Sequence, residues 1–381
     1  MFGYIGPAIA YYLAASLDVD TLFLLERDSD LIQSTINRLK PFEPSKKIIA
    51  LQYDIDQLND FPFNEVDVIA AALPWQTTKS LIRIARQHNI PMVSITRPQY
   101  QELAALTVQT SDSAPIILAC GLEPGLTEIL ALYLVEVYEQ VDELRIYCGG
   151  LPQQTNPEFN YKKVFGHRLP LDKKDAYYIN AGQLCIAPRF SGIESIVIPG
   201  IGTLEAWHDG MVPWLFEYQK FKNIKYCSQK TLRWPGFANT VNLLSKLGFL
   251  SETPIIFQGN TISPREFIET ILHPYTHFDP AIDREMTILY LKAIGLNSYG
   301  KKMVRTLCLT DRYDENSGLT SMARATGYTL GYVAIQLAQD YKKYRGLIRP
   351  EQLLADEAVK GLLITLQQNG MRIEIQQEEV E

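Results

Sequence analysis

Two glycines near the start of the chain, in MFGYIGPAIAYYLA, have the spacing of a phosphate-binding turn. Such a turn has the form G-x-G-x-x-G between a strand and a helix, and its backbone N–H groups bind the pyrophosphate of a dinucleotide. Gly3 and Gly6 fill the second and third glycine positions, and Met1 stands where the first glycine would be. We therefore expect Gly3, Tyr4, Ile5 and Gly6 to bind a dinucleotide cofactor.

An acidic residue follows at the distance that this turn requires. Glu26 lies twenty residues after Gly6 and ends the apolar run TLFLLE. An acid there bonds the adenosine ribose and repels a 2′-phosphate, which favours NAD over NADP; the alternative is that Glu26 is simply the first solvated residue after a buried strand. Arg27 favours NADP, because a guanidinium can pair with that phosphate. Asp54, at the end of KIIALQYD, either flanks the adenine or caps its own loop.

Two further strand ends are expected beside the cofactor. DVIAAALP ends in Ala72, Leu73 and Pro74, and APIILACG ends in Cys120 and Gly121. Ligands of open parallel sheets bind outside the carboxyl ends of the strands, so the backbone at both places is expected to pass next to the dinucleotide. Cys120 is interpreted as a nicotinamide contact, with a buried small thiol as the alternative.

Alternating apolar strands and helices position these residues. The runs 21–28, 47–54, 67–74, 91–96 and 114–121 are almost wholly apolar, and helical periodicity separates them. This pattern predicts an α/β fold, a Rossmann-type doubly wound parallel sheet. The strand that should precede the glycine turn is absent from the sequence, and without it two strand edges would be exposed in mid-sheet. We therefore expect the natural chain to begin earlier.

After residue 141 the pattern changes to long alternating strands with many aromatic side chains. This region predicts a second domain of the α+β class with an antiparallel or mixed sheet. The helix that contains ARATGY (323–328) is expected to return to the first domain. We predict a dinucleotide-binding domain from residues 1–126 plus about 311–381, and a substrate-binding and dimerisation domain from about 127–310.

Composition excludes several classes of function. The net charge of −7 disfavours nucleic-acid binding, which needs clustered Lys and Arg. No apolar run reaches the length of a membrane span. Five widely spaced cysteines without a C-x-x-C pair indicate a reducing cytoplasm and no structural zinc. Pro274, between His273 and His277, argues against a regular helix presenting both histidines to a metal, so no metal is expected.

Six segments, in order, resemble those of the saccharopine dehydrogenase and lysine 6-dehydrogenase family. They are ACGLEPGLTEILA (119–131), GGLPQ (149–153), YKKVF (161–165), SGIESIVIPGIGTLEAWHDG (191–210), KTLRWPGF (230–237) and ARATGY (323–328). The chain departs from the family pattern at Phe237, where a histidine is common, and at His208, where a small hydroxyl residue is usual. The resemblance covers nearly the whole chain.

The resemblance implies NAD(P)-linked hydride transfer at an amine-bearing carbon of an amino acid, by a cytoplasmic homodimer. NAD is the expected cofactor and NADP the alternative. Two other functions stay open. One is a polyamine dehydrogenase of the carboxynorspermidine type, and the other is a non-catalytic protein that keeps the dinucleotide fold for binding or structure.

Hydride transfer at an amine requires groups that orient the substrate and move one proton. Arg233 is the first candidate to bind a substrate carboxylate, because a guanidinium fixes it bidentately; an ion pair between domains is the alternative. Asp209 is placed to hold an ammonium group or to cap a turn, and His208 to exchange a proton or to serve structurally. With Cys120, these form the candidate catalytic set. Glu123 and Thr326 are candidate substrate contacts.

Overall fold

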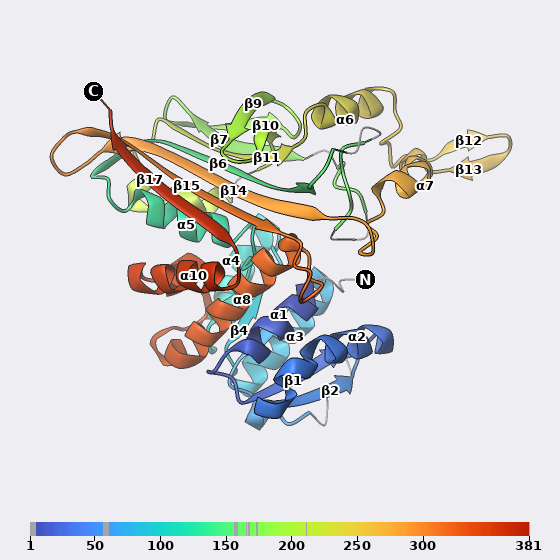
Figure 1. Ribbon diagram of the computed structural model, residues 1–381, viewed down its shortest axis with the longest axis vertical. Helices are drawn as coiled ribbons and strands as arrows, with labels where there is room; N and C mark the ends of the chain where they lie inside the picture. Colours follow the sequence, from blue (N-terminus) through green and yellow to red (C-terminus); the bar gives the residue numbers. More distant parts are fainter. Residues whose placement is uncertain are drawn as a thin grey trace. The chain divides into compact units, whose positions relative to one another are not determined.

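The computed structural model describes residues 5–55, 61–155, 159–164, 166, 168–172, 174–210 and 212–380 (Figure 1). The chain folds into two compact units. The first comprises Met1–Ile129, Glu315–Leu319 and Ala323–Gln368, and the second comprises Leu130–Asp314, Thr320–Met322 and Asn369–Glu381.

The first unit contains parallel strands separated by helices, which confirms the predicted α/β class. Its strands are β1 (Thr21–Glu26), β2 (Lys47–Gln52), β3 (Ile69–Ala71), β4 (Met92–Ser94), β5 (Ile116–Ile117) and β16 (Leu347–Ile348). Its helices are α1 (Ile5–Ala15), α2 (Ser29–Leu39), α3 (Trp75–His88), α4 (Tyr100–Thr110), α9 (Pro350–Leu353) and α10 (Asp356–Gln368). Two more helices, α5 (Leu126–Val135) and α8 (Ser321–Asp340), have residues in both units.

The parallel strands of the first unit fall into two groups. β1 pairs with β2, and a second sheet has the order β16-β5-β4-β3. Within the described residues no strand joins β1 to β3. In a doubly wound sheet the first strand would lie between these two. The division therefore falls where the sequence lacks the expected strand.

Close packing of α1 on α8 holds the first unit together. A Cβ added to Gly327 would lie 2.8 Å from Ala8 Cβ and 2.9 Å from the backbone nitrogen of Ile9, and one at Gly331 would lie 2.4 Å from the ring of Tyr12. Only glycine allows the two helices this approach. The second half of the ARATGY segment is thereby fixed against the helix that follows the glycine turn.

The second unit is built on a mixed sheet, which confirms the predicted α+β class. The order is β17-β15-β14-β6-β11-β10-β9, and β7 pairs with both β11 and β8. β6 and β11 are parallel, and the long strands β14, β15 and β17 run antiparallel side by side (Figure 1). The strands are β6 (Gln140–Pro152), β7 (Asp175–Asn180), β8 (Gln183–Pro188), β9 (Glu194–Ile198), β10 (Gly202–His208), β11 (Tyr226–Arg233), β14 (Glu285–Leu296), β15 (Lys302–Arg312) and β17 (Arg372–Glu379).

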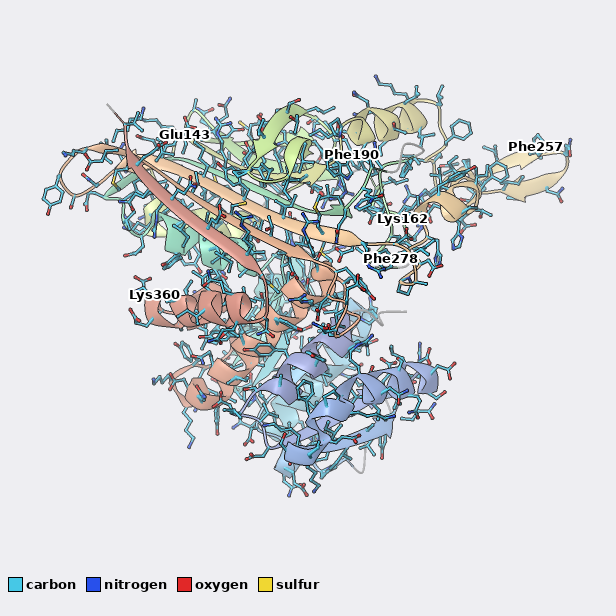
Figure 2. All side chains as sticks on the ribbon, viewed as in Figure 1. Glu143, Lys162, Phe190, Phe257, Phe278 and Lys360 are labelled. Carbon is cyan, nitrogen blue, oxygen red and sulfur yellow. The ribbon has the colours of Figure 1, made fainter. Side chains whose placement is uncertain are left out.

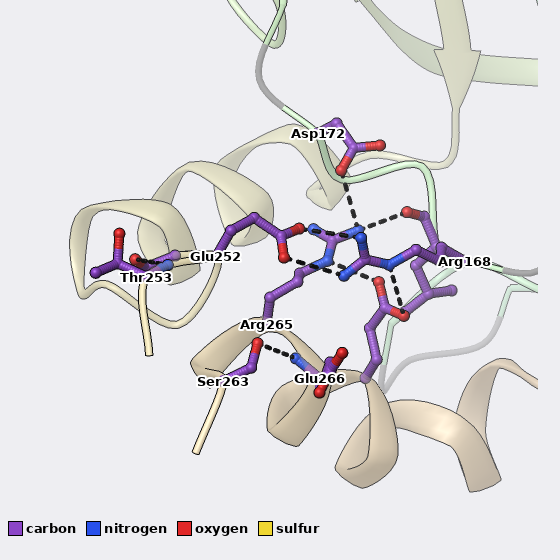
Figure 3. Close-up of polar contacts among 10 residues, drawn as sticks. Arg168, Asp172, Glu252, Thr253, Ser263, Arg265 and Glu266 are labelled. Carbon is purple, nitrogen blue, oxygen red and sulfur yellow. Dashed lines mark hydrogen bonds and ion pairs between the residues drawn. The ribbon is translucent and has the colours of Figure 1, made fainter. Parts of the chain in front are cut away.

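An extension of the second unit consists of α6 (Phe237–Lys246), the hairpin of β12 (Ile255–Phe257) and β13 (Asn260–Ile262), and α7 (Pro264–Thr276). Phe257 marks the end of the hairpin (Figure 2). A charged network fixes the base of the extension (Figure 3). Arg265, 1% exposed, pairs with Glu269 at 2.7 Å and donates to Leu169 O at 2.7 Å. Arg168 pairs with Glu252 at 3.1 Å.

One prediction about the organisation of the chain is wrong, whereas the ends of two helices follow local chemistry. Asp28 caps α2, because its carboxylate accepts from the backbone nitrogens of Asp30 and Leu31. α7 includes Pro274 in its last turn, where few backbone bonds remain to be lost, and it ends at Thr276, before His277. The end of the chain does not belong wholly to the first domain, because β17 pairs with β15 in the second unit.

The packing of α1 on α8 leads to a prediction about stability. Gly327→Ala should lower the free energy of unfolding by about 1–3 kcal/mol, because the clash is with backbone atoms that cannot rotate away. Gly361→Ala on α10 is the matched control, since its Cβ would meet only the hydroxyl end of Tyr332, 2.5 Å away. Urea denaturation of both variants checks this, and equal losses would contradict it.

Candidate functional site

Hydrogen bonds tie the carboxyl ends of β3, β4 and β5 into one edge. Thr96 Oγ1 donates to Leu73 O at 2.7 Å, and Cys120 N donates to Ser94 O at 3.0 Å. The backbone nitrogen of Ala119 donates to Thr96 O at 2.9 Å. The structure thus brings together the strand ends at 72–74 and 119–121, on the edge where open parallel sheets bind their ligands.

Three further candidates, Thr326, Ile5 and Gly6, lie on helices of the first unit. Gly121 is in contact with Thr326 of α8, whose methyl group would be 3.0 Å from a Cβ at that glycine. Ile5 and Gly6 form the first turn of α1, and a Cβ at Gly6 would meet no atom within 4 Å. Open space at a helix N-terminus fits the close approach of a pyrophosphate. Gly3 and Tyr4 lie outside the described residues.

Glu26 ends β1 as predicted, and its carboxylate interacts with its own loop. Glu26 Oε1 accepts from the backbone nitrogens of Arg27 at 2.7 Å and Asp28 at 3.1 Å. These bonds orient the carboxylate at the strand end without involving its second oxygen. The side chains of Arg27 and Asp54 are exposed.

Burial decides the protonation of two groups around the 119–125 loop. Burial, with a smaller effect of Glu351, raises the pKa of the Cys120 thiol far above its ordinary value, so a nucleophilic thiolate is excluded at neutral pH. Glu128, in the first turn of α5, was not predicted; burial raises its pKa to about 7, against the hydrogen bonds from Gly125 N and Thr127 Oγ1. The exposed carboxylate of Glu123 repels the charged form of Glu128 and so raises the pKa of Glu128 further.

In the second unit, Asp209 is the counterion of two basic residues. It pairs with Arg189 at 2.7 Å and with Lys174 at 2.8 Å, and it accepts from Thr231 Oγ1 at 2.6 Å. Burial pushes the pKa of Asp209 upward, but Arg189 and Lys174 outweigh this and hold that pKa well below its ordinary value. The carboxylate is therefore already compensated, which disfavours the predicted role of holding a substrate ammonium group.

His208 ends β10 and stays neutral at pH 7. Burial and then the neighbouring Lys230 lower its pKa to about 4. Its ring packs against Gly192, at φ +59°, where a Cβ would lie 2.4 Å away. This contact explains the glycine of the SGIE segment. A pKa of about 4 makes this imidazole a weak base at pH 7, which disfavours the predicted proton exchange and favours the structural role.

Arg233, at the end of β11, is buried among aromatic rings. Its Cζ lies 5.2 Å from the ring centroid of Tyr161 and 5.9 Å from those of Trp207 and Phe237, and its Nη1 donates to Leu232 O at 2.7 Å. Gly149 lies against both residues of this bond, because a Cβ there would lie 2.3 Å from Leu232 O and 3.0 Å from Nη1. The substitution to phenylalanine at 237 therefore contributes a ring to the surroundings of this guanidinium.

Some residues that shape both regions were not assigned a role from the sequence. Ser94 and Thr96 follow a buried strand, and their hydroxyl groups gave no signal of their own. Arg189 and Lys174 lie outside the family-like segments, so their pairing with Asp209 emerges only from the fold. Among the described residues no group of three or more His, Cys, Asp or Glu side chains is arranged to hold a metal ion, and no helix is both long and apolar enough to cross a membrane.

Parallel strands with a polar, tied carboxyl edge and an open helix N-terminus define a Rossmann-type dinucleotide-binding fold. The sequence model of the saccharopine dehydrogenase C-terminal domain matches residues 121–371. The chain therefore belongs to the saccharopine dehydrogenase family. Enzymes of this family are NAD(P)-dependent dehydrogenases acting on CH–NH groups, which is the class expected from the sequence.

Individual proteins agree with this assignment. The saccharopine dehydrogenase [NADP(+), L-glutamate-forming] of Schizosaccharomyces pombe is 21% identical, over 87% of this chain and 88% of its own. The enzyme of the same name from Pyricularia oryzae is 22% identical, over 69% of this chain and 65% of its own. The saccharopine dehydrogenase (L-Glu forming) structure from Saccharomyces cerevisiae has a TM-score of 0.78 at 18% identity, covering 100% of this chain and 98% of that one. The homospermidine synthase of Legionella pneumophila, in complex with NAD, has a TM-score of 0.56 at 11% identity, covering 100% and 90%.

The lowered pKa of His208 has a consequence for stability. The folded-state pKa of about 4 lies below the ordinary value of about 6.5, so the unfolded state binds the proton more readily between these values. Stability contributed by neutral His208 is present above pH 6.5 and is lost as the pH falls towards 4, by at most about 1.4 kcal/mol per pH unit. Relative to His208→Gln, the wild type should lose stability over this window in urea titrations. If the free energy of unfolding depends on pH in the same way for both proteins, the expectation is wrong.

Proposed function

We propose that the chain is an amino-acid dehydrogenase of the saccharopine type, which oxidises a carbon bearing a secondary or primary amine. The observation that carries the proposal is the tied edge formed by Leu73, Thr96, Cys120 and Gly121, with Thr326 against it. Family membership supports the reaction class, and the names of the two curated relatives support saccharopine as the substrate.

The reaction removes a hydride from the amine-bearing carbon and a proton from its nitrogen, giving an imine that water hydrolyses to a carbonyl compound and a free amine. The nicotinamide nucleotide supplies the hydride acceptor when bound. In this proposal Gly3, Tyr4, Ile5 and Gly6 bind its pyrophosphate, and Ala72, Leu73, Pro74, Cys120 and Gly121 line its path. Cys120, uncharged at neutral pH, serves as a packing contact.

The substrate side of the proposal depends on charge. Arg233 offers a buried guanidinium to a carboxylate, and Thr326 and Glu123 lie by the Gly121 loop to contact the substrate. A polyamine would need carboxylates to bind its ammonium groups, yet Asp209 is taken up by Arg189 and Lys174. This arrangement favours an amino acid over a polyamine. The homodimer implied by the resemblance stays a prediction.

The activity is tested by incubating the purified chain with saccharopine, L-lysine and spermidine, each with NAD and with NADP. We expect reduction of the nucleotide at 340 nm with saccharopine, together with release of L-glutamate. Turnover of spermidine alone would favour the polyamine alternative. Nucleotide binding without turnover of any amine would favour the non-catalytic one.

The choice of nucleotide depends on Glu26 and Arg27. We propose NAD as the preferred cofactor, because the oriented carboxylate of Glu26 would repel a 2′-phosphate. The names of the curated relatives support NADP instead, and the exposed Arg27 would be its contact. Glu26→Gln should raise the affinity for NADP by about tenfold and leave that for NAD within about threefold, since a like-charge repulsion of about 1.4 kcal/mol is removed.

Calorimetric titration with both nucleotides measures this, with Arg27→Ala as the matched change on the neighbouring residue. Arg27→Ala should weaken NADP binding only. If Glu26→Gln leaves both affinities unchanged, the carboxylate interacts with its own loop alone and does not select the nucleotide.

A further inference from the structure

Three aromatic rings surround the guanidinium of Arg233 in the second unit. Tyr161, Trp207 and Phe237 are each at most 2% exposed, and Arg233 is 5% exposed. Trp207 and Phe237 are stacked, with centroids 5.4 Å apart, and Tyr161 lies 5.7 Å from Phe237. We call Tyr161, Trp207, Phe237 and Arg233 the aromatic cage.

Two atoms on the neutral side chains of the aromatic cage have no hydrogen-bond partner among the described residues. Among the residues that the structure describes, nothing bonds the hydroxyl of Tyr161 or the Nε1–H of Trp207, although both atoms are fully buried. An indole N–H can only donate, and a buried donor without an acceptor destabilises the folded state. A ligand group that accepts hydrogen bonds from these two atoms would remove the cost.

The charge of the surroundings specifies what that ligand group is. Burial raises the pKa of Tyr161, while Arg233 and Arg189 both act to lower it, so the potential at its hydroxyl is positive. Asp209 is paired with Arg189 and Lys174. The rings of the aromatic cage already have one guanidinium within about 6 Å, and a second cation beside it would be repelled. An acceptor of negative charge fits these conditions.

We propose that Tyr161 and Trp207, together with Arg233, bind a carboxylate of the amino-acid substrate and so determine substrate specificity. The inference rests on the proposed function, because it extends the carboxylate contact from Arg233 to two neutral donors. A carboxylate has enough lone pairs to accept from all three side chains, and two neutral donors fix its orientation without adding charge. Both donors come from segments that the family resemblance contains, YKKVF and LEAWHDG.

Tyr161→Phe tests this role, because it removes only the hydroxyl oxygen. We expect the thermal midpoint of the variant to equal or exceed that of the wild type, since an unpaired buried group is lost. The KM for saccharopine should rise by tenfold or more, and kcat at saturation should stay within about twofold. Trp207→Phe should raise KM in the same direction. Tyr290→Phe, a half-buried tyrosine of β14, is the matched control and should leave KM unchanged.

Binding of glutarate without nucleotide, measured by calorimetry, separates this inference from the proposed function. Glutarate bound by the wild type and at least tenfold more weakly by Tyr161→Phe supports the carboxylate site, even if no amine is oxidised, in which case only the proposed function fails. An unchanged affinity and KM in Tyr161→Phe overturns the inference. A lowered thermal midpoint alongside weaker binding also overturns it, because the hydroxyl then serves the fold.

Discussion

Burial of charge on β10 and β11 is the constraint on which the second unit depends. A charged side chain out of water must be paired, and removing one partner strands the other. Asp209 meets this requirement for Arg189, and Glu194 meets it for Lys230 at 2.9 Å. Glu205 accepts from the backbone nitrogens of Gly236 and Ala238 at the start of α6. The pairing of charges therefore fixes the register of these strands and the helix that follows them, as well as the surroundings of the candidate site.

Much of the fold could be predicted because the strands of a doubly wound sheet are buried on both faces and read as continuous apolar runs. The runs at 21–28 and 47–54 became β1 and β2, and DVIAAALP and PMVSIT contain β3 and β4. The cap of α2 does not follow from residue types alone. Asp28 and Ser29 both satisfy the requirements of an N-cap, and only the position of the Asp28 carboxylate selects between them. The strand β17 was placed in the wrong unit because its mostly polar sequence, RIEIQQEE, carries no information about its partner.

In the candidate site, too, some features could be predicted from the sequence and others could not. Positions that depend on backbone, such as Leu73, Cys120 and Gly121, follow from the strand ends, and the fold brings them to one edge. Roles that depend on protonation did not follow, because residue type gives only the ordinary pKa and the surroundings set the actual one. His208 and Asp209 were chosen for proton exchange and cation binding. Burial and Lys230 lower the pKa of His208, and the ion pairs with Arg189 and Lys174 already compensate the charge of Asp209.

Basic side chains act on His208 and Asp209 beside the effect of burial. Lys230 lies by His208, two basic residues pair with Asp209, and three aromatic rings lie around Arg233. These basic groups would attract an acidic ligand and repel an ammonium group. The same argument accounts for Phe237, because a ring at that position gives Arg233 a face to lie on without neutralising its charge. The departure from the family pattern is therefore compatible with the carboxylate binding proposed for the aromatic cage.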